Sequence, residues 1–518
     1  MNYDHIIIGA GSAGAIIASR LTEDAHRNVL LLEAGPDYPD LDEMPPDVKF
    51  GYGHGLAAID VLGTEHRWHF VAKSTDHAAP MLVPRGKTTG GSSAVNAQIF
   101  LRGVPEDYDD WASWGNDEWG FQKLIPFFNR METDTDYSDD FHGVDGPTIV
   151  RRYKPDEWLP DQQAWYQAAR EYGFVDCPDH NDPDSTGVGP SPFNNPNRIR
   201  WSTNIGYLSE ARSRPNLTIT ARALVHRILF EGGRAVGVEF EADGELQSVY
   251  GDEIILSAGA IGSPHLLMLS GVGPADHLRD MGIAVVHELP GVGKNLRDHP
   301  QVQLTWETKP GFEQDSLAPR IQFIVRYTAE GSDLRNDMLI HPFSYATRSL
   351  YYTDPNTEPI GIGMIAAIYL AESAGEMLLR ATNPRIQPFL NYNLLATEFD
   401  RRRMRESVRI CLDIAEKDTL ADLIASRRFP TDAEIESEQT LDDWMMRNVR
   451  TSHHISGTCK MGPADDSMAV VNQYARMHGI ESLRVADASI MPDCIRANTN
   501  ATSMVIGERV AEFIKDGN

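Results

Sequence analysis

Short apolar runs separated by glycine-rich turns recur along the chain, and they predict buried strands joined to helices. Residues 5–8 form the first run, the turn Gly9–Gly14 follows at once, and a helical pattern leads to a second run at residues 29–32 that ends in Glu33. Apolar strands that alternate with helices are typical of a parallel sheet covered on both faces. The N-terminal pattern therefore predicts an α/β unit.

The turn at residues 9–14 has the spacing GxGxxG of dinucleotide-binding folds. In such a turn Gly9 allows a tight bend, Gly11 lets the backbone approach a pyrophosphate, and Gly14 lets the helix pack closely on the strand. Glu33 lies 19 residues beyond Gly14, near the ~20 expected for a carboxylate that accepts hydrogen bonds from ribose hydroxyls. The segment predicts an adenine dinucleotide site, and the choice between FAD and NAD stays open at this point.

Three later segments extend this pattern. Residues 85–97 combine glycine, serine and threonine in a backbone nest suited to an anionic ligand. Residues 253–256 form another apolar strand before a helix, and a short strand from residue 483 ends in Asp487. The chain has no second GxGxxG, which counts against an enzyme that is reduced by NAD(P)H.

Length and composition narrow the function classes. At 518 residues the chain exceeds the ~250 to 300 residues at which a single core stops growing, so two lobes are expected. Its 47 Lys and Arg against 75 Asp and Glu give a net charge of -28, which repels phosphate backbones and anionic bilayers. We therefore expect no nucleic-acid partner. The four cysteines are too scattered for a metal site, and they indicate a reducing compartment.

Neither the N-terminus nor the most apolar later stretch has the pattern of a membrane anchor. The most apolar later stretch, Ile360 to Ala371, has 12 residues, short of the ~20 that span a bilayer. The N-terminus runs into the first strand without the basic and apolar regions of a secretory leader. We expect no membrane span and a cytoplasmic location.

Several blocks occur in the order seen in the glucose-methanol-choline (GMC) family of FAD-dependent oxidoreductases, and the chain resembles that family over essentially its whole length. The blocks are the GxGxxG turn with Glu33, residues 85–96, residues 259–274, residues 295–299, the motif at residues 454–458 and the segment at residues 498–500.

The resemblance implies an α/β fold, α+β overall, in which a Rossmann-like FAD-binding domain adjoins a substrate domain of antiparallel sheet flanked by helices. The FAD-binding domain would be non-contiguous, formed by residues 1–148, 200–298 and 449–518. The substrate-binding domain would comprise residues 149–199 and 299–448.

The same resemblance implies the cofactor contacts. Gly9, Gly11, Gly14 and Glu33 would hold the ADP half of FAD, Val225 the adenine edge, Asp487 the hydroxyls of the flavin side chain, and Gly91, Ser93 and Asn96 the flavin. The other expected contacts are Ser12, Ala13, Ala34, Arg85, Gly90, Ala488, Asn498 and Thr499. Valine occupies position 95, where family members with covalently attached FAD carry histidine, so we expect non-covalent FAD.

Oxidation of an alcohol requires a base for the hydroxyl proton and a positioned hydride acceptor. Histidine suits this task near neutral pH, and the family's HxxGT register selects His454 as the base. Asn498 and Asn500 offer both a helix N-cap and a residue that holds the substrate oxygen. The resemblance aligns Asn500 with the family's second active-site position, which is filled by histidine or asparagine, so we assign the catalytic role to Asn500. His453 is expected beside the substrate or in a structural role.

An asparagine at the second active-site position resembles the choline oxidase and hydroxymethylfurfural oxidase branches of the family more than the sugar oxidases. Choline enzymes place a carboxylate in the substrate domain, and an ungapped alignment puts Gln322 there. We therefore expect Gln322 to contact substrate, and a primary aryl or furanic alcohol rather than choline.

Alternatives remain at the level of sequence. Electrons could pass to O2, the slightly favoured acceptor, or to a quinone or other carrier. A lyase similar to the FAD-containing hydroxynitrile lyases, and a flavin-binding scaffold without catalysis, are the competing classes. The oligomeric state is not determined by any of these patterns.

Overall fold

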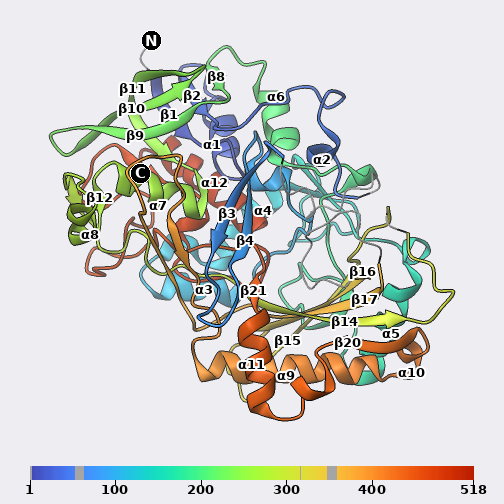
Figure 1. The fold of residues 1–518 in the computed structure, drawn as a ribbon. Coiled ribbons are helices and arrows are strands. Elements are labelled where there is room, and N and C mark those ends of the chain that lie inside the picture. The colour runs from blue at the N-terminus through green and yellow to red at the C-terminus, as the bar shows by residue number, and fades with distance from the viewer. Residues whose placement is uncertain (1–2, 53–63, 316, 347–358) are drawn as a thin grey trace.

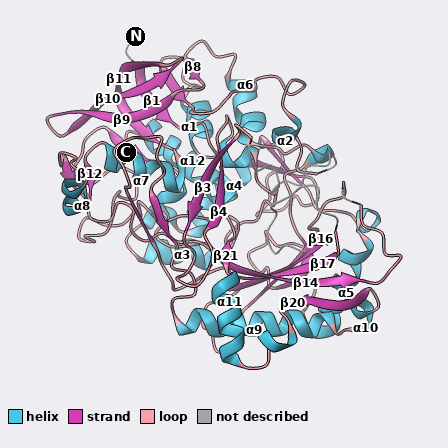
Figure 2. Cartoon of the chain, viewed as in Figure 1, coloured by secondary structure: helices cyan, strands magenta, loops and turns pink. Residues whose placement is uncertain are grey.

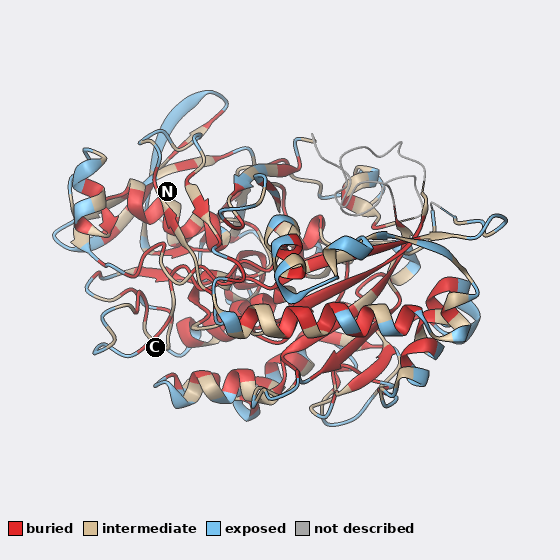
Figure 3. Ribbon diagram, turned by 60° about the horizontal axis from the view of Figure 1, so that its bottom comes forward, coloured by how far each residue is buried: buried red, intermediate tan, exposed pale blue. Residues whose placement is uncertain are grey.

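Two lobes, each built on its own sheet, form the molecule (Figure 1). The computed structural model describes residues 3–52, 64–315, 317–346 and 359–518. Figure 3 shows that buried residues concentrate in the strands and on the inward sides of the helices.

The sheet of the first lobe is mainly parallel at its centre and antiparallel at one edge. Strands β1, β2, β8, β11 and β22 pair in parallel, whereas β9, β10 and β11 form an antiparallel meander. Its strands in spatial order are β8 (Leu217–Thr220), β2 (Val29–Leu32), β1 (Tyr3–Ile8), β11 (Glu245–Leu256), β10 (Arg234–Ala242) and β9 (Leu224–Glu231), with β22 (Leu483–Val485) also on β11.

Helices from both ends of the chain complete this lobe. Helix α1 (Gly14–Leu21) packs against α12 (Thr499–Lys515). Gly507 permits the close approach, because a Cβ at that position would lie 2.8 Å from the carbonyl oxygen of Ala13. Helix α7 (Gly259–Leu269) follows β11. The start of α12 is thereby fixed next to the glycine turn after β1.

The sheet of the second lobe is antiparallel throughout. Helices α5 (Pro160–Tyr172) and α9 (Glu398–Ala415) pack against it, and Figure 2 shows the helices on its outer side, away from the first lobe. Its strands in order are β20 (Ile424–Phe429), β14 (Pro300–Thr308), β17 (Gly361–Ile368), β16 (Met338–Ala346), β15 (Phe323–Tyr327) and β7 (Gly187–Pro190), with β21 (Arg450–Thr451) also on β14.

Shorter elements connect and cover the lobes. The two-stranded sheets pair β3 (Arg67–Ala72) with β4 (Met81–Gly86), β5 (Glu132–Asp134) with β6 (Thr148–Val150), β12 (Val272–Gly273) with β13 (His287–Glu288), and β18 (Glu376–Leu378) with β19 (Phe389–Asn391). The other helices are α2 (Pro46–Lys49), α3 (Pro105–Ser113), α4 (Phe121–Met131), α6 (Ser209–Ala211), α8 (Ala275–Asp280), α10 (Asp418–Ala421) and α11 (Glu438–Asn448).

The predicted fold class is confirmed: a Rossmann-like lobe lies beside an antiparallel sheet flanked by helices. The apolar stretch at residues 360–371 contains the buried strand β17, and no helix in the described part of the chain is long and apolar enough to cross a bilayer. The domain boundaries stay a prediction. Two described strands pair across the predicted boundaries: β21 joins the second sheet, and β5 pairs with β6, which straddles residue 148.

We expect the buried ion pairs of Arg403 to be essential for the second lobe. Its guanidinium lies 2.7 Å from both Asp337 and Asp400, and all three side chains are fully buried. Arg403→Leu leaves buried carboxylates without a counter-charge, so the free energy of unfolding should fall by about 3–5 kcal/mol. Equilibrium urea unfolding followed by circular dichroism measures this change.

The matched control is Arg409→Leu on the same helix, where the ion pair with Glu438 is exposed. That substitution should cost less than about 1 kcal/mol. Equal losses for the two variants would contradict the importance of burial.

Candidate active site

A cavity of ≈ 920 Å³ extends between the lobes, near the upper end of the ~300 to 1,000 Å³ typical of ligand pockets. It runs from the carboxyl ends of the first lobe's strands to the inner face of the second sheet. Segments that line it include residues 8–9, 11–13, 32–34, 67–70, 84–86, 91–92, 95–99, 223–225, 257–262, 450–455, 487–488 and 498–500.

The glycine turn after β1 lies at one end of this cavity. Gly9 has φ +99°, and a Cβ there would lie 2.5 Å from the carbonyl oxygen of Ser257. A Cβ on Gly14 would lie 2.0 Å from the carbonyl oxygen of Gly9, whereas a Cβ on Gly11 would meet no atom closer than 3.8 Å. Gly9 and Gly14 are therefore needed for packing, and Gly11 leaves the room that a pyrophosphate requires at the start of α1.

Glu33 is fixed beside this turn. Its carboxylate accepts hydrogen bonds from the backbone N–H groups of Ala10 (3.0 Å) and Gly35 (2.8 Å). Burial raises the pKa of Glu33 to about 7, against the effect of these two amides. The carboxylate lines the cavity together with Ala34 and Val225. This is the arrangement that binds the ribose hydroxyls of an adenosine.

A second carboxylate, that of Asp487, follows β22. It accepts hydrogen bonds from the N–H of Gly259 (2.9 Å) and the hydroxyl of Ser263 (2.5 Å), and burial raises its pKa. Gly259 has φ +81°, and no atom lies within 4 Å of the position that a Cβ would take there. Asp487, Ala488 and Gly259 line the cavity, so a polar chain with hydroxyls fits between them.

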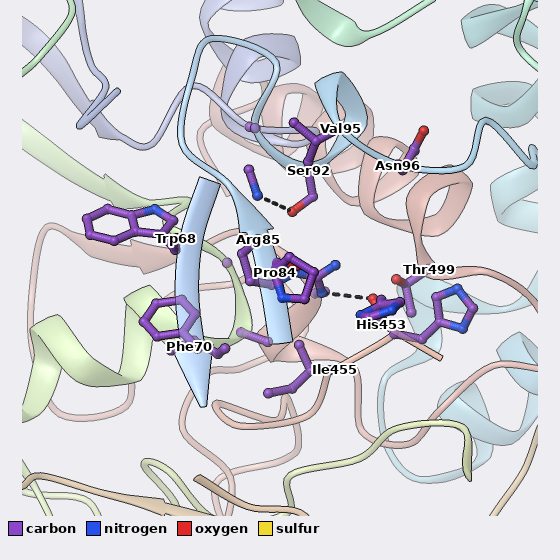
Figure 4. A pocket seen from close by; sticks show the side chains of 18 of the residues that line it. Trp68, Phe70, Pro84, Arg85, Ser92, Val95, Asn96, His453, Ile455 and Thr499 are labelled. Atoms are coloured by element: carbon purple, nitrogen blue, oxygen red, sulfur yellow. Dashed lines mark hydrogen bonds between the residues drawn. The ribbon is translucent and has the colours of Figure 1, made fainter. Parts of the chain in front are cut away.

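The loop after β4 closes against the glycine turn. A Cβ on Gly91 would lie 2.6 Å from the Cα of Gly11, so the two loops touch. Gly91, Asn96 and Val95 line the cavity. Figure 4 shows Val95 and Asn96 above the strand that carries Arg85, whose guanidinium donates a hydrogen bond of 2.8 Å to the carbonyl oxygen of His453.

Most of the residues predicted to contact the cofactor therefore line this cavity. The three exceptions are Gly14, Gly90 and Ser93. Gly14 and Gly90 shape the turns, and the hydroxyl of Ser93 donates to the carbonyl oxygen of Gly90 at 2.6 Å. The glycine cradle, the two carboxylates and the nest of loop amides fit FAD, with the ADP half at the first turn and the flavin half toward the second sheet.

His454 lies where the cavity reaches the second lobe. Its Nδ1 is 2.9 Å from Nδ1 of His299, and its Nε2 is 3.0 Å from the amide nitrogen of Asn498. Burial lowers the pKa of His454 well below its ordinary value, and His299, His453 and neighbouring cations act in the same direction. The imidazole is therefore neutral near pH 7 and can act as a base.

The pairing of His454 with Asn500 is corrected by this geometry. Helix α12 begins at Thr499, so the side chain of the N-cap residue Asn498, which makes no capping bond, reaches His454. Asn500 lies in the first turn, where its carbonyl oxygen accepts a hydrogen bond of 2.9 Å from the hydroxyl of Ser12. Asn500 thus belongs to the cofactor side of the cavity.

His453 lines the cavity but in a different environment. Its backbone has φ +66°, and its buried Nδ1 has no hydrogen-bond partner. Burial and then Arg85 lower its pKa to about 3. A neutral His453 at this place is compatible with the predicted substrate contact, and the carbonyl bond from Arg85 gives it a structural role as well.

The prediction for Gln322 is wrong. Its side chain is fully buried outside the cavity lining, where it accepts a hydrogen bond from the N–H of Leu159 (2.7 Å) and donates one to the carbonyl oxygen of Glu157 (2.9 Å). Gln301 and Gln303 of β14 line the cavity instead. Their alternation along a strand was the signal that could have located them.

The wall formed by the second sheet is mostly apolar. Ile324, Leu339, Phe343 and Ile365 line it together with His341, whose pKa burial lowers to about 4. Among the cavity-lining residues within the described ranges, the only carboxylates are Glu33 and Asp487. Both lie at the cofactor end, so the described part of this wall offers no anionic partner for a cationic substrate.

A cluster of potential metal ligands lies elsewhere, formed by Glu132, Asp134 and His142. The cluster is already charge-paired, since Arg102 bonds to Glu132 and Arg152 bonds to Asp134. We interpret it as a buried ion-pair network.

The sequence profile of GMC oxidoreductases matches residues 3–301 in its N-terminal part and residues 371–507 in its C-terminal part. An oxygen-dependent choline dehydrogenase of Chromohalobacter salexigens is 36% identical over 99% of this chain and 95% of its own. The mitochondrial choline dehydrogenase of Mus musculus is 35% identical over 99% of this chain and 89% of its own.

Solved structures agree in fold. Pyridoxine 4-oxidase from Mesorbium loti superposes with a TM-score of 0.88 at 28% identity, covering 99% of both chains. A fungal aryl-alcohol oxidase superposes with a TM-score of 0.84 at 23% identity, covering 100% of this chain and 99% of its own. The chain belongs to the GMC oxidoreductase family of FAD-dependent enzymes that act on CH–OH donors.

Proposed function

We propose that this enzyme oxidises a primary alcohol, of the aryl or furanic class, to the aldehyde, and that O2 accepts the electrons. The observation that carries the proposal is the position of His454, whose Nε2 lies 3.0 Å from the amide nitrogen of Asn498 at a cavity that is also lined by the residues expected to hold FAD. Bound FAD supplies the hydride acceptor. The protein has to remove one proton, hold one oxygen and exclude water.

His454 performs the first of these tasks. On binding, the substrate hydroxyl replaces the amide of Asn498 as the donor to Nε2. Nε2 then takes the hydroxyl proton, while the freed amide donates toward the oxygen on which negative charge develops. The apolar side chains of the second sheet hold the ring of the substrate and keep water away from this oxygen. We propose that His453 forms part of the cavity wall beside the substrate. Asn500 lies on the side of the cavity where FAD would bind.

The substrate class rests on the wall rather than on the relatives. The relatives are named as choline dehydrogenases, whereas the described wall joins Ile324, Leu339 and Ile365 with neutral amides. Burying a quaternary ammonium group against such a wall costs desolvation without a compensating charge. An uncharged aromatic alcohol meets no such cost.

A second candidate is a dehydrogenase that passes electrons to a quinone or another carrier. The names of the relatives favour it, and the residues at His454 serve either acceptor equally. A lyase of the hydroxynitrile type would use the same histidine without reducing the flavin.

We expect Asn498, and not Asn500, to act with His454. His454→Ala should slow anaerobic bleaching of the flavin by a primary alcohol about 10²- to 10⁴-fold, and Asn498→Ala should slow it about 10- to 100-fold because one hydrogen bond to developing charge is lost. Asn500→Ala is the matched control and should change the rate less than Asn498→Ala does. Stopped-flow absorbance measures all three.

Admitting air then separates the acceptors. Rapid recovery of the yellow colour with formation of peroxide supports an oxidase, and slow recovery supports the dehydrogenase. Unimpaired bleaching in His454→Ala would refute the assignment of the base, and a flavin that no alcohol bleaches would favour the lyase.

The preference for uncharged alcohols can be measured with a matched pair of substrates. Choline and 3,3-dimethylbutan-1-ol have nearly the same shape and differ in the charge of the quaternary centre. We expect kcat/KM to be at least about tenfold higher for the uncharged alcohol, which corresponds to about 1.4 kcal/mol. A higher value for choline would exclude the proposed substrate class.

FAD should be released intact by acid or heat. Val95 has no nucleophilic atom, so the covalent bond formed by histidine at this position cannot form. The precipitated protein should be colourless and the supernatant should contain all of the flavin, as measured by absorbance. Recovery of a flavin-bearing peptide by mass spectrometry would contradict non-covalent binding.

A further inference from the structure

His299 is a buried titratable residue that the proposed chemistry does not use. It is fully buried, lies just before β14 and is outside the cavity lining. Its ring stacks on Tyr369 with centroids 4.2 Å apart and planes 9° apart. It contacts His454 through the ring nitrogen Nδ1, on the side away from Asn498.

The hydrogen bonds around His299 determine which nitrogen carries its proton. Nε2 is 2.8 Å from the carbonyl oxygen of Ile495. A carbonyl oxygen only accepts, so Nε2 of His299 carries the proton and donates it. In a neutral ring Nδ1 is then a lone-pair acceptor.

The hydrogen bond between the two rings fixes the proton of His454 as well. Its Nδ1 is 2.9 Å from Nδ1 of His299, and two unprotonated nitrogens cannot form a hydrogen bond. Nδ1 of His454 must therefore be the donor, which leaves Nε2 unprotonated. The amide of Asn498, 3.0 Å from that Nε2, has N–H groups to donate, so the chain of donors and acceptors is consistent from end to end.

We infer that His299 is the positioning residue that holds His454 in the tautomer whose Nε2 can accept the substrate proton. The inference rests on the proposed role of His454 as base. Without the acceptor at His299, the proton of His454 is free to occupy Nε2, where it would donate toward the cavity, and the ring could not act as a base in that form.

The carboxylate of Asp298 holds the backbones of His299 and His454 at a fixed distance from each other. Asp298 accepts hydrogen bonds from the backbone N–H groups of His299 (2.7 Å) and His454 (3.1 Å) and from the hydroxyl of Thr451. Burial raises the pKa of Asp298 to about 6. The carboxylate bonds to the backbone N–H groups and not to the ring nitrogens. It therefore fixes the distance between the two rings, while the acceptor for Nδ1–H of His454 is supplied by His299.

Burial is the largest of the effects that keep both rings neutral. Burial lowers the pKa of His299 to about 3, with Arg297 acting in the same direction and the carbonyls of Ile495 and Tyr369 opposing it. Around His454 the facing groups are His299, His453, Arg85 and His341, and each of them lowers its pKa.

The test compares two variants of the FAD-loaded enzyme. The carbonyl oxygen of asparagine can take the place of Nδ1, so His299→Asn keeps an acceptor, whereas His299→Leu keeps apolar bulk and removes it. We expect His299→Leu to lower kcat about 100-fold with KM changed less than about threefold. His299→Asn should stay within about fivefold of the wild-type kcat, since one neutral hydrogen bond of altered geometry is worth about 1 kcal/mol.

Two readouts distinguish tautomer control from packing. In His299→Leu the acid limb of the kcat/KM pH profile should move to lower pH, because protonated His454 loses the acceptor for its Nδ1–H, while His299→Asn should keep the wild-type limb. Ring ¹⁵N spectra of histidine-labelled protein should show His454 unprotonated at Nε2 in the wild type and partly protonated there in His299→Leu.

Flavin content and thermal unfolding confirm that both variants are folded. Wild-type kcat and pH profile in His299→Leu, or equal losses in the two variants with an unmoved profile, would overturn the inference. Bleaching that survives in His454→Ala would instead refute the proposed function, so the two failures are separate results.

Discussion

The buried carboxylate of Asp298 connects the parts on which the site depends. It lies where the chain leaves the first lobe to enter β14, and it accepts hydrogen bonds from residues of both the 298–299 and 451–454 segments. An unpaired buried carboxylate would be costly, and three donors offset that cost. His454 and the second sheet are therefore held by the same carboxylate, so the cavity wall formed by that sheet has a fixed position relative to His454.

Local spacing made the cofactor end predictable. The glycine turn and Glu33 are set by a strand, a helix and a second strand in sequence, and a GxGxxG turn has the same geometry wherever that order occurs. The structure accordingly places Gly9, Gly11 and Glu33 around one cavity end. Long-range pairs were not predictable in this way. His299 meets His454 across 155 positions of the chain, and no periodicity links them.

Two errors have the same physical origin. A motif locates a segment but not the direction of each side chain, and Asn498 and Asn500 differ only in that one precedes α12 while the other lies within its first turn. In the same way, the side chain of Gln301 faces the cavity and that of Gln322 does not. Only the pairing of the strands shows which side chains face the cavity. The second lobe lacks glycine motifs, so alignment there had nothing local to fix its register.

Family membership and substrate choice are carried by different parts of this molecule. Residues around His454 come from the C-terminal segment and from the entry to β14, whereas the wall opposite comes from alternating positions of β14 and β16 and from single residues of β15 and β17. Side chains at those alternating positions can change without moving the backbone bonds that hold the base. A chain 36% identical to choline dehydrogenases can therefore belong to the same family while its described wall presents apolar side chains and neutral amides. For the same reason the proposed preference for a neutral ring over a cation rests on the strand faces rather than on the motifs that define the family.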